Sequence, residues 1–391
     1  MCVPVYASGA ESADSSVINL QAVEVLANRA GATTPVAFTN VRKAELERSN
    51  DGRDMPYLLS MTPSVLATGD AGAGMGYTSL RLRGSDASRI NITANGVPVN
   101  DAESHRVYWV NMPDIASSVR DVQIQRGAGT SANGAGAFGG SVNLVTDAPS
   151  FDPYAEFAGS YGMYATNKQT LRVGSGLLGD HWSVAARLSH AGSDGYIDRA
   201  FSKLWSYFGQ VAWVNDGTSL RLLAYGGKEQ TYMAWDYASR EQMEKYGRRY
   251  NPCGEYTDDE GRTAYYPNQT DNYVQHNFQL HWGQDLGRGL HLNLALHYTK
   301  GDGYYEQYKT RRTLTEYGLK PFVDADGTTV TKSDLIRDKS LDNGFGGGVF
   351  SLSRRRGRVD AVLGGALSNY RGHHFGTVEW VRNYVGPINP S

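Results

Sequence analysis

Cysteine is almost absent from this chain: only Cys2 and Cys253 occur among its 391 residues. Two cysteines are too few for a disulfide framework, and they match no spacing of a metal site. An excess of charge of one sign is also missing, because 38 Lys and Arg stand against 40 Asp and Glu. With a net charge of −2, the chain lacks the basic surface that nucleic-acid binding requires.

Long apolar runs are missing as well. No segment approaches the roughly 18 consecutive apolar residues of a membrane-spanning helix, so the chain is not a helical membrane protein. It is instead rich in glycine (46) and tyrosine (25). A transmembrane β-barrel has this composition, since its strands alternate lipid-facing apolar and inward polar residues and collect aromatic side chains at the interfaces.

The second half of the sequence consists of alternating segments of about ten residues, which is the strand length of such a barrel. Short and long connections alternate between the segments, as in an up-and-down barrel. The long connections are residues 192–202, 230–271 and 301–342. The predicted strands are 154–162, 166–177, 181–191, 203–214, 218–229, 272–283, 290–300, 343–353 and 358–370.

One of these segments shows the expected two faces clearly. Between residues 290 and 298, leucines occupy every second position, while His291, Asn293 and His297 occupy positions between them. Because successive strand residues point to opposite faces, the leucines should face lipid and the polar set the interior. The histidines are interpreted as polar lining and not as metal ligands, and no metal site is predicted.

The strand count does not close a barrel. Nine strands are too few to enclose a folded domain, whereas plugged barrels have about 22 strands. We therefore expect a mainly β fold: a small α+β domain followed by the first part of a transmembrane antiparallel barrel. The expected division is 1–17 residual signal or disordered leader, 18–30 linker with an extended segment, 31–150 globular domain and 151–391 incomplete barrel.

Residues 80–146 hold three motifs in a fixed order. The first is Leu-Arg-Leu-Arg-Gly at 80–84, the second Asn-Gly-Val-Pro-Val-Asn-Asp at 95–101, and the third runs from Val122 to Thr146. The third contains a Gly-x-Gly-x-x-Gly match at 134–139, which would bind a dinucleotide only if a helix followed. The alternating, β-branched residues 141–146 predict a strand instead.

Together these motifs resemble the plug domain of TonB-dependent outer-membrane receptors, including those for siderophores and other iron complexes. The resemblance implies a TonB box near the N-terminus, an extended strand that pairs with the periplasmic partner TonB and its ExbB–ExbD energising complex. It places the box in the alternating segment 18–27. The assigned residues are Leu20, Gln21, Ala22, Val23, Glu24 and Val25.

The resemblance also implies a lock between plug and barrel. Arg83 and Arg126, each just before a glycine at a strand end, are the candidates for ion pairs with barrel carboxylates; ordinary solvated arginines are the alternative. The glycines of the motifs should serve turns and close backbone approaches. They are Gly84, Gly96, Gly127, Gly134, Gly136, Gly139 and Gly140.

Cargo contacts are expected in the loop that follows the second motif. Ring faces, a guanidinium and a carboxylate occur there together, although the same residues could equally pack the plug against the barrel wall. The candidates are Glu103, His105, Arg106, Tyr108 and Trp109. Two short helices are predicted before this region, at 39–49 with Thr39 as cap and at 53–62.

The family resemblance implies a function in transport. The protein would be a multi-pass barrel in lipid of the bacterial outer membrane, exported by a signal peptide, that imports a scarce nutrient with the help of TonB. An iron chelate is the first candidate for the small-molecule cargo; cobalamin, haem and an oligosaccharide are alternatives, as is a passive porin. No cluster of catalytic side chains is visible, so neither an enzyme nor a cofactor is predicted.

Overall fold

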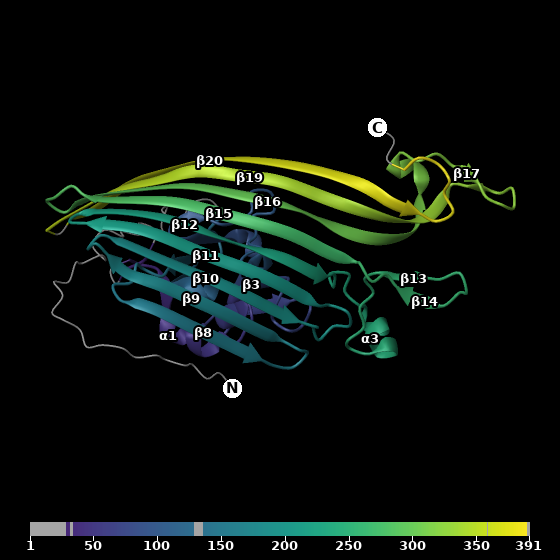
Figure 1. The fold of residues 1–391 in the computed structure, drawn as a ribbon, viewed down its shortest axis with the longest axis horizontal. Coiled ribbons are helices and arrows are strands. Elements are labelled where there is room, and N and C mark those ends of the chain that lie inside the picture. The colour runs from purple at the N-terminus through teal and green to yellow at the C-terminus, as the bar shows by residue number, and fades with distance from the viewer. Residues whose placement is uncertain (1–28, 32–33, 129–135, 358, 389–391) are drawn as a thin grey trace.

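The computed structural model describes residues 29–31, 34–128, 136–357 and 359–388. Its N-terminal part, residues 37–146, is a compact α+β domain, and the remainder is one curved antiparallel sheet that covers this domain (Figure 1). Strand predominates over helix, as predicted from the sequence. No helix in the described ranges has the length and apolar content to cross a bilayer.

The N-terminal domain is built on a five-stranded sheet in the order β1-β6-β7-β4-β5. β4 and β7 are parallel, while the other neighbours are antiparallel. β2 and β3 form a separate antiparallel ribbon. The strands are β1 Ala37–Arg42, β2 Val65–Gly69, β3 Thr78–Leu82, β4 Ile90–Ala94, β5 Val97–Pro98, β6 Val119–Arg126 and β7 Gly140–Thr146.

The helices of this domain are short. They are α1 Lys43–Ser49, α2 Met55–Leu58 and the 3₁₀ turns Ala87–Arg89, Trp109–Asn111 and Ile115–Ser118. The predicted helix at 39–49 is therefore wrong in its first part. Residues 37–42 pair along their whole length with β6, and this long-range pairing outweighs the local signal of Thr39 as a cap. The second predicted helix is real but is confined to one turn.

The domain core extends into the large sheet. Val122, Ile124, Val142 and Leu144 are buried in the middle of β6 and β7, and Val142 lies opposite Ile124. The same apolar cluster includes Phe208, Leu223 and Tyr225 from the sheet. The domain and the sheet are thus joined by a common dry core as well as by polar contacts.

The large sheet has nine antiparallel strands, each paired with its neighbour in the chain order. This number equals the number predicted from the sequence. The strands are β8 Pro153–Tyr161, β9 Asn167–Leu178, β10 Trp182–Ser193, β11 Ser202–Asn215, β12 Thr218–Tyr232, β15 Thr270–Asp285, β16 Leu290–Thr313, β19 Lys332–Arg356 and β20 Val359–Val381.

The tight connections lie at one end of the sheet and the long ones at the other, as Figure 1 shows. The long connections carry small elements of their own: α3 Arg240–Tyr246, the hairpin of β13 Glu255–Thr257 and β14 Thr263–Tyr265, a 3₁₀ turn Leu314–Tyr317, and the hairpin of β17 Phe322–Val323 and β18 Thr329–Val330.

The sequence underestimated the length of the later strands. Residues 301–342 were expected to be a loop, but β16 continues to Thr313 and β19 begins at Lys332. The two strands are hydrogen-bonded through most of this extension, where Lys309 lies opposite Leu335. These residues are polar and rich in tyrosine, so the extension lacks the apolar alternation by which strands are recognised.

The predicted two-faced character of the sheet is confirmed. Leu296 is 48% exposed, whereas its neighbours Ala295 and His297 are 8% and 7% exposed. Leucines therefore point away from the N-terminal domain, and the small and polar residues between them point toward it. A soluble barrel would have the opposite arrangement.

Candidate binding cavity

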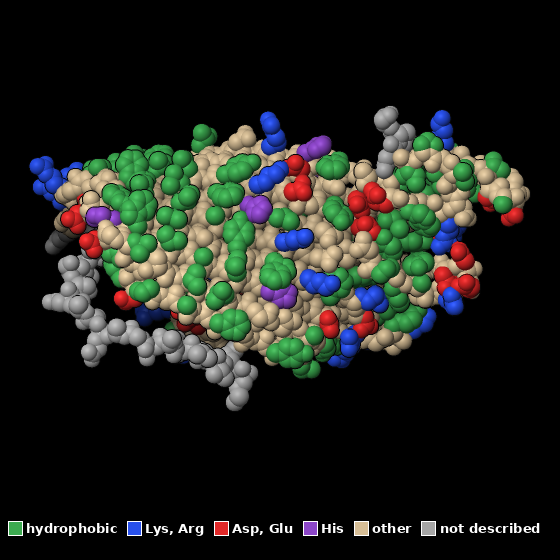
Figure 2. Space-filling model, in the orientation of Figure 1, with side chains coloured by type: hydrophobic (Ala, Val, Ile, Leu, Met, Phe, Trp, Pro, Cys, Tyr) green, Lys and Arg blue, Asp and Glu red, His purple; other side chains and the backbone are tan. Residues whose placement is uncertain are grey.

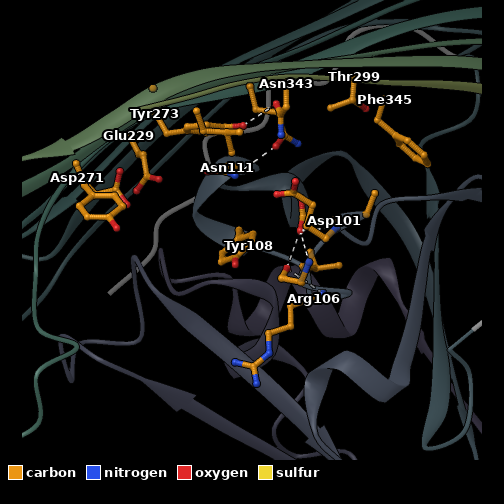
Figure 3. A pocket seen from close by; sticks show the side chains of 18 of the residues that line it. Asp101, Arg106, Tyr108, Asn111, Glu229, Asp271, Tyr273, Thr299, Asn343 and Phe345 are labelled. Atoms are coloured by element: carbon orange, nitrogen blue, oxygen red, sulfur yellow. Dashed lines mark hydrogen bonds between the residues drawn. The ribbon is translucent and has the colours of Figure 1, made fainter. Parts of the chain in front are cut away.

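A cavity of about 770 Å³ lies between the N-terminal domain and the concave face of the large sheet (Figure 3). Its floor is the loop at 98–112, and its walls are β12, β15, β16, β19 and β20 together with the segment after β12. Most of these elements are far apart in sequence. A cavity of this size suits a small-molecule ligand.

Four aromatic rings cross this cavity in a chain of edge-to-face contacts. The ring centroids of Tyr108 and Tyr77 are 6.3 Å apart, those of Tyr77 and Trp235 are 5.6 Å apart, and those of Trp235 and Tyr305 are 5.6 Å apart. The two tyrosines at 77 and 108 belong to the N-terminal domain, while Trp235 and Tyr305 belong to the sheet and its loops. We call these four residues the aromatic ladder. They offer ring faces for stacking against a planar or apolar ligand.

Acidic side chains outnumber basic ones in the lining. Four of the lining residues are Asp or Glu, whereas Arg106 and Lys339 are the two with permanent positive charge. Arg106 is directed away from the sheet (Figure 3) and donates to Asp86 at 3.1 Å. The cavity is therefore suited to a neutral or cationic ligand better than to a polyanion. The acidic residues are Asp101, Glu103, Glu229 and Asp271.

Two of these carboxylates connect the N-terminal domain to the sheet. The Tyr77 hydroxyl donates to Asp271, and Glu103 lies 2.8 Å from Nε2 of His374 on β20. Burial is the first cause that raises the pKa of the Tyr77 hydroxyl well above its ordinary value, and the neighbouring carboxylates raise it further. The hydroxyl therefore stays protonated and remains a donor at physiological pH.

Amides and hydroxyls make up the remaining polar wall. The Tyr273 hydroxyl donates to Asn343 Oδ1 at 2.9 Å, and Asn111 Nδ2 donates to Gln275 Oε1 at 3.2 Å. Asn111 Oδ1 is buried and has no partner in the described part of the chain. Neutral groups of this kind fix the orientation of a ligand without contributing charge.

The structure brings together three of the five residues assigned to cargo binding from the sequence. Glu103, Arg106 and Tyr108 line the cavity. Trp109 is 2% exposed and lies in the core of the N-terminal domain. His105 is absent from the lining; it has a left-handed backbone with φ of 58°. The residues that the sequence did not reveal are Tyr77, Trp235 and Tyr305, because they come from three separate segments.

A second site holds the N-terminal domain against the sheet. The carboxylate of Asp114 lies 3.2 Å from Lys168 Nζ and accepts hydroxyl donors from Thr170 and Ser189, both at 2.7 Å. The side chains of Asp114 and Lys168 are 1% and 3% exposed. Arg187 donates to the backbone carbonyl of Asp114. We call this set of five residues the Asp114 lock.

The charge state of Asp114 follows from these neighbours. Burial alone would raise its pKa, but Lys168 and Arg187, together with hydroxyl donors, hold the pKa well below its ordinary value. The carboxylate is therefore ionised at neutral pH. Removing one partner of a buried ion pair strongly destabilises the protein, because the other charge is left buried and unpaired.

A further contact lies at the end of β7. Arg172 on β9 pairs with Asp147 at 2.7 Å, and Lys43 of α1 reaches the same carboxylate at 2.8 Å. Arg221 on β12 donates to the Asp147 carbonyl at 3.0 Å. At both contacts an acid of the N-terminal domain or of the segment directly after it meets bases of the sheet, and only Lys43 comes from the N-terminal domain itself. The polarity between the two parts is opposite to the one the resemblance implied.

The two arginines assigned to the lock from the sequence lie elsewhere. Arg126 donates to Thr39 Oγ1 at 2.7 Å, within the N-terminal domain. Arg83 has a left-handed backbone with φ of 50°, and its Nη1 lies 3.9 Å from the position of a Cβ on Gly127. Within the ranges that the structure describes, neither arginine has a recorded ion pair with a strand of the large sheet. Their predicted role stays a prediction.

The glycines of the motifs occupy crowded or left-handed positions. A Cβ on Gly140 would lie 2.4 Å from the Gln125 carbonyl oxygen, and one on Gly139 would lie 2.5 Å from Ser85 Cβ. The third motif therefore brings backbones together and leads into the strand β7, as predicted. Gly84, Gly96, Gly127 and Gly136 have φ between 79° and 99°. Gly134 and the TonB box segment at 18–27 lie outside the described residues.

The buried carboxyl group of Asp54 should make the free energy of unfolding of the N-terminal domain depend on pH. Burial is the main cause that raises its pKa from 3.8 to about 7, against hydrogen bonds from Thr78 and the Gly76 backbone that lower it. The folded state then binds a proton more tightly than the unfolded state, so stability falls as pH rises from about 4 to 7 and is flat above. The loss is on the order of 4 kcal/mol.

Replacement of Asp54 by Asn should abolish this slope and stabilise the N-terminal domain above pH 7. Urea unfolding followed between pH 4 and 8 measures it. Asp258→Asn, on an exposed outer loop, is a control that should retain the slope. A slope that is unchanged in Asp54→Asn would contradict the assignment.

The described residues contain no group of three or more His, Cys, Asp or Glu arranged to hold a metal ion. The cavity presents aromatic rings, hydrogen-bonding groups and charge, and the Asp114 lock joins the N-terminal domain to the sheet.

Comparisons with known proteins find a known domain family in the N-terminal part of the chain. A sequence profile described as "TonB-dependent Receptor Plug Domain" matches residues 30–141. The ferrienterobactin receptor of Escherichia coli (strain K12) is 23% identical over 356 residues, which cover 82% of this chain and 46% of that protein. The chain thus spans about half the length of this curated relative.

Solved structures share the fold at low sequence identity. The ferric citrate transporter FecA in its unliganded form has a TM-score of 0.64 at 16% identity, over 90% of this chain and 51% of that chain. The copper transporter OprC has a TM-score of 0.64 at 15% identity, over 89% and 48%. Because these two structures are named for different cargoes, the fold alone does not decide the ligand.

Proposed function

We propose that this chain, a member of the TonB-dependent receptor family, takes part in active import of a scarce small molecule across the bacterial outer membrane, with an iron chelate as the first candidate. The observation that carries the proposal is that the N-terminal domain and the sheet enclose a cavity of ligand size between them and are held together by the buried Asp114 lock. The N-terminal domain is the plug in this proposal, and the large sheet is part of the barrel wall.

An outer-membrane location is supported by the convex face of the sheet. Apolar side chains cover much of this face between its two ends, and charged ones gather at both ends, more of them toward the end that carries α3 (Figure 2). One register row runs across seven strands and is almost wholly aliphatic; we call it the apolar row. It consists of Val184, Val211, Leu222, Leu280, Leu296, Gly348 and Leu367.

The next row on the same face, two residues closer to the tight turns along each strand, contains three tryptophans. Trp182, Trp213 and Trp282 lie in it, and Trp182 is 50% exposed. Tryptophan rings collect at the boundary between hydrocarbon and headgroups. This arrangement supports placing the tight turns in the periplasm and the long loops outside the cell.

The cargo is proposed from the cavity. The aromatic ladder provides ring faces, and the acidic excess disfavours a polyanionic chelate, so a neutral or cationic iron chelate fits best. Cobalamin, haem and an oligosaccharide are the alternatives within the family, while a passive porin is the alternative outside it.

The mechanism has three steps. Cargo enters from the outer loops and contacts Tyr77 and Tyr108 of the plug. Binding makes the TonB box at 18–27 available to TonB, which is driven by ExbB–ExbD. Force from that partner then separates the plug from the wall by breaking polar contacts such as the Asp114 lock, and a path opens. No covalent step occurs.

Deletion of residues 18–27 tests the energy-coupled part of this proposal. The variant should still bind cargo at the cell surface but should lose accumulation by at least about tenfold, because the strand that would pair with TonB is missing. Radio-iron uptake by whole cells and binding to energy-depleted cells measure the two quantities.

A deletion of the same length in the outer hairpin at 321–330 is the control for TonB coupling and should leave coupling to TonB intact. A passive porin would accumulate cargo equally with and without residues 18–27, and that result would overturn the proposal.

A further inference from the structure

One short segment of the plug joins the cavity to the Asp114 lock. It begins at Tyr108 of the aromatic ladder, passes through the 3₁₀ turn Trp109–Asn111 and ends at Asp114. Tyr108 and Asn111 line the cavity (Figure 3), whereas the Asp114 side chain is 1% exposed within the lock. We call residues 108–114 the linking segment. Asn111 and Asp114 are so close in the chain that neither can move far without the other.

The middle of the linking segment sits in a socket on the sheet. A Cβ on Gly227 of β12 would lie 2.6 Å from Pro113 Cδ and 3.3 Å from the Asn111 carbonyl oxygen. Glycine at this position therefore allows the backbone of the segment to approach the strand closely. Because the segment is packed tightly between its two ends, a shift at the cavity end is passed on to the lock end.

Two features of the linking segment are unfavourable while the lock is closed. Asn111 Oδ1 is buried and accepts no hydrogen bond from any residue that the structure describes, and a buried acceptor without a donor is costly. Asp114 has a left-handed backbone with φ of 51°, which a residue with a Cβ adopts only at an energetic cost. The contacts of the Asp114 carboxylate hold the segment in this conformation in spite of both costs.

The burial of Asn111 Oδ1 decides the direction of the effect. Because this oxygen is buried, a donor group of a ligand can reach it only if the linking segment moves toward the cavity. That movement separates Pro113 from its socket on Gly227. It also separates the Asp114 carboxylate from Lys168. The ligand contact and the closed lock therefore exclude each other, so a ligand that makes this contact weakens the lock.

We propose that a ligand in the cavity opens the Asp114 lock through the linking segment, with Asn111 as the residue that connects the two sites. The inference rests on the proposed function, because it assigns a regulator to a contact that force from TonB would have to break. An empty cavity leaves the lock closed and the plug firmly attached. An occupied cavity weakens the attachment before any force arrives through residues 18–27.

Reciprocity between the two sites gives the test. If the ligand weakens the lock, a broken lock strengthens ligand binding by the same factor, so Asp114→Asn should bind a neutral ferric hydroxamate about tenfold more tightly than the unaltered chain. Thr170→Val removes one hydroxyl donor from the Asp114 carboxylate and should tighten binding by a smaller factor. Equilibrium binding of the radio-iron chelate to the full chain in detergent measures both. Equal or weaker binding by both variants would overturn the proposal.

Arg172→Gln is the matched control. Arg172 also joins the sheet to an acid, Asp147, at 2.7 Å, but neither residue belongs to the linking segment, so the affinity should stay unchanged. Asn111→Ala cuts the connection, and adding Asp114→Asn to it should no longer raise the affinity. Equal tightening in Arg172→Gln, or tightening by Asp114→Asn that persists without Asn111, would also contradict the coupling.

A fluorine label at position 108 gives a measurement that needs no ligand. With fluorotyrosine in place of Tyr108, the fluorine resonance should shift in Asp114→Asn and stay in place in Arg172→Gln, because only the first variant releases the linking segment. A resonance that moves in neither variant, or equally in both, would overturn the coupling. Failure of the unaltered chain to bind ferric hydroxamate, cobalamin and haem would count against the proposed function, and the resonance would still decide the coupling.

Discussion

Replacement of Asp114 by Asn should weaken the attachment of the plug to the sheet by about 3–5 kcal/mol, which is the typical cost of leaving a buried charge without its partner. Lys168 would remain buried without its counter-ion, and Arg187 would lose a favourable charge nearby. Asn keeps the size of the side chain, so the effect reports charge and hydrogen bonding more than packing.

Hydrogen exchange in the full chain should show the release directly. Amides of β6 and β7 should lose protection in Asp114→Asn, while amides of the barrel strands stay protected. Cells that carry the variant should also become sensitive to vancomycin, which is too large for an intact outer membrane, because a loosened plug leaves a passage.

Two further variants sharpen the result. Asp258→Asn breaks a solvent-accessible ion pair with Arg262 on an outer loop and should leave the attachment of the plug unchanged, because exposed ion pairs contribute little to stability. Lys168→Met combined with Asp114→Asn should recover part of the loss, because it removes the buried, unpaired cation. Unchanged exchange in Asp114→Asn would show that the apolar core around Phe208 and Leu223 holds the plug alone.

Replacement of Trp235 by Ala should weaken cargo binding by about 2 kcal/mol, or roughly 30-fold, which is the usual effect of removing an aromatic side chain at the centre of a binding site. Trp235 contacts both Tyr77 and Tyr305, so its removal interrupts the aromatic ladder at its midpoint. Equilibrium binding of radio-iron chelates to the purified protein measures the change.

The choice of probe tests the charge of the cavity at the same time. A neutral ferric hydroxamate should bind more tightly than a trianionic ferric tris-catecholate, because acidic side chains outnumber basic ones in the lining of the cavity. Cobalamin and haem complete the set. Tighter binding of the tris-catecholate would contradict the charge argument.

Trp205→Ala is the matched control for the tryptophan change. Trp205 lies on the convex face and is 60% exposed, so its loss should leave the affinity of every probe unchanged. Equal weakening by both variants would point to a general loss of structure instead of a missing contact.

Much of the fold could be predicted because it depends on local patterns. Apolar alternation identified nine strands and the outward face of Leu296, and the order of three motifs indicated the plug. The errors occurred where the pairing of strands depends on residues that are distant in the sequence. Residues 37–42 become a strand through contact with β6, and the extended arms of β16 and β19 hold each other without an apolar pattern.

The binding cavity could be predicted only in part. The loop at 101–109 supplied three lining residues, since polar and aromatic side chains in a loop are a local signal. Nothing in the sequence indicates that Tyr77, Trp235 and Tyr305 meet, because they are brought together by barrel curvature and by the position of the plug. The same is true of Asp114 and the residues of its lock.

The sequence by itself determined which residues face inward and which face outward, because side-chain direction in a strand follows from position along the chain. Only the tertiary structure decided the polarity of the lock and the partners of each charge. Both depend on which strand lies beside which loop. The residues that flank a charged side chain in the sequence do not indicate which partner it will contact in the fold.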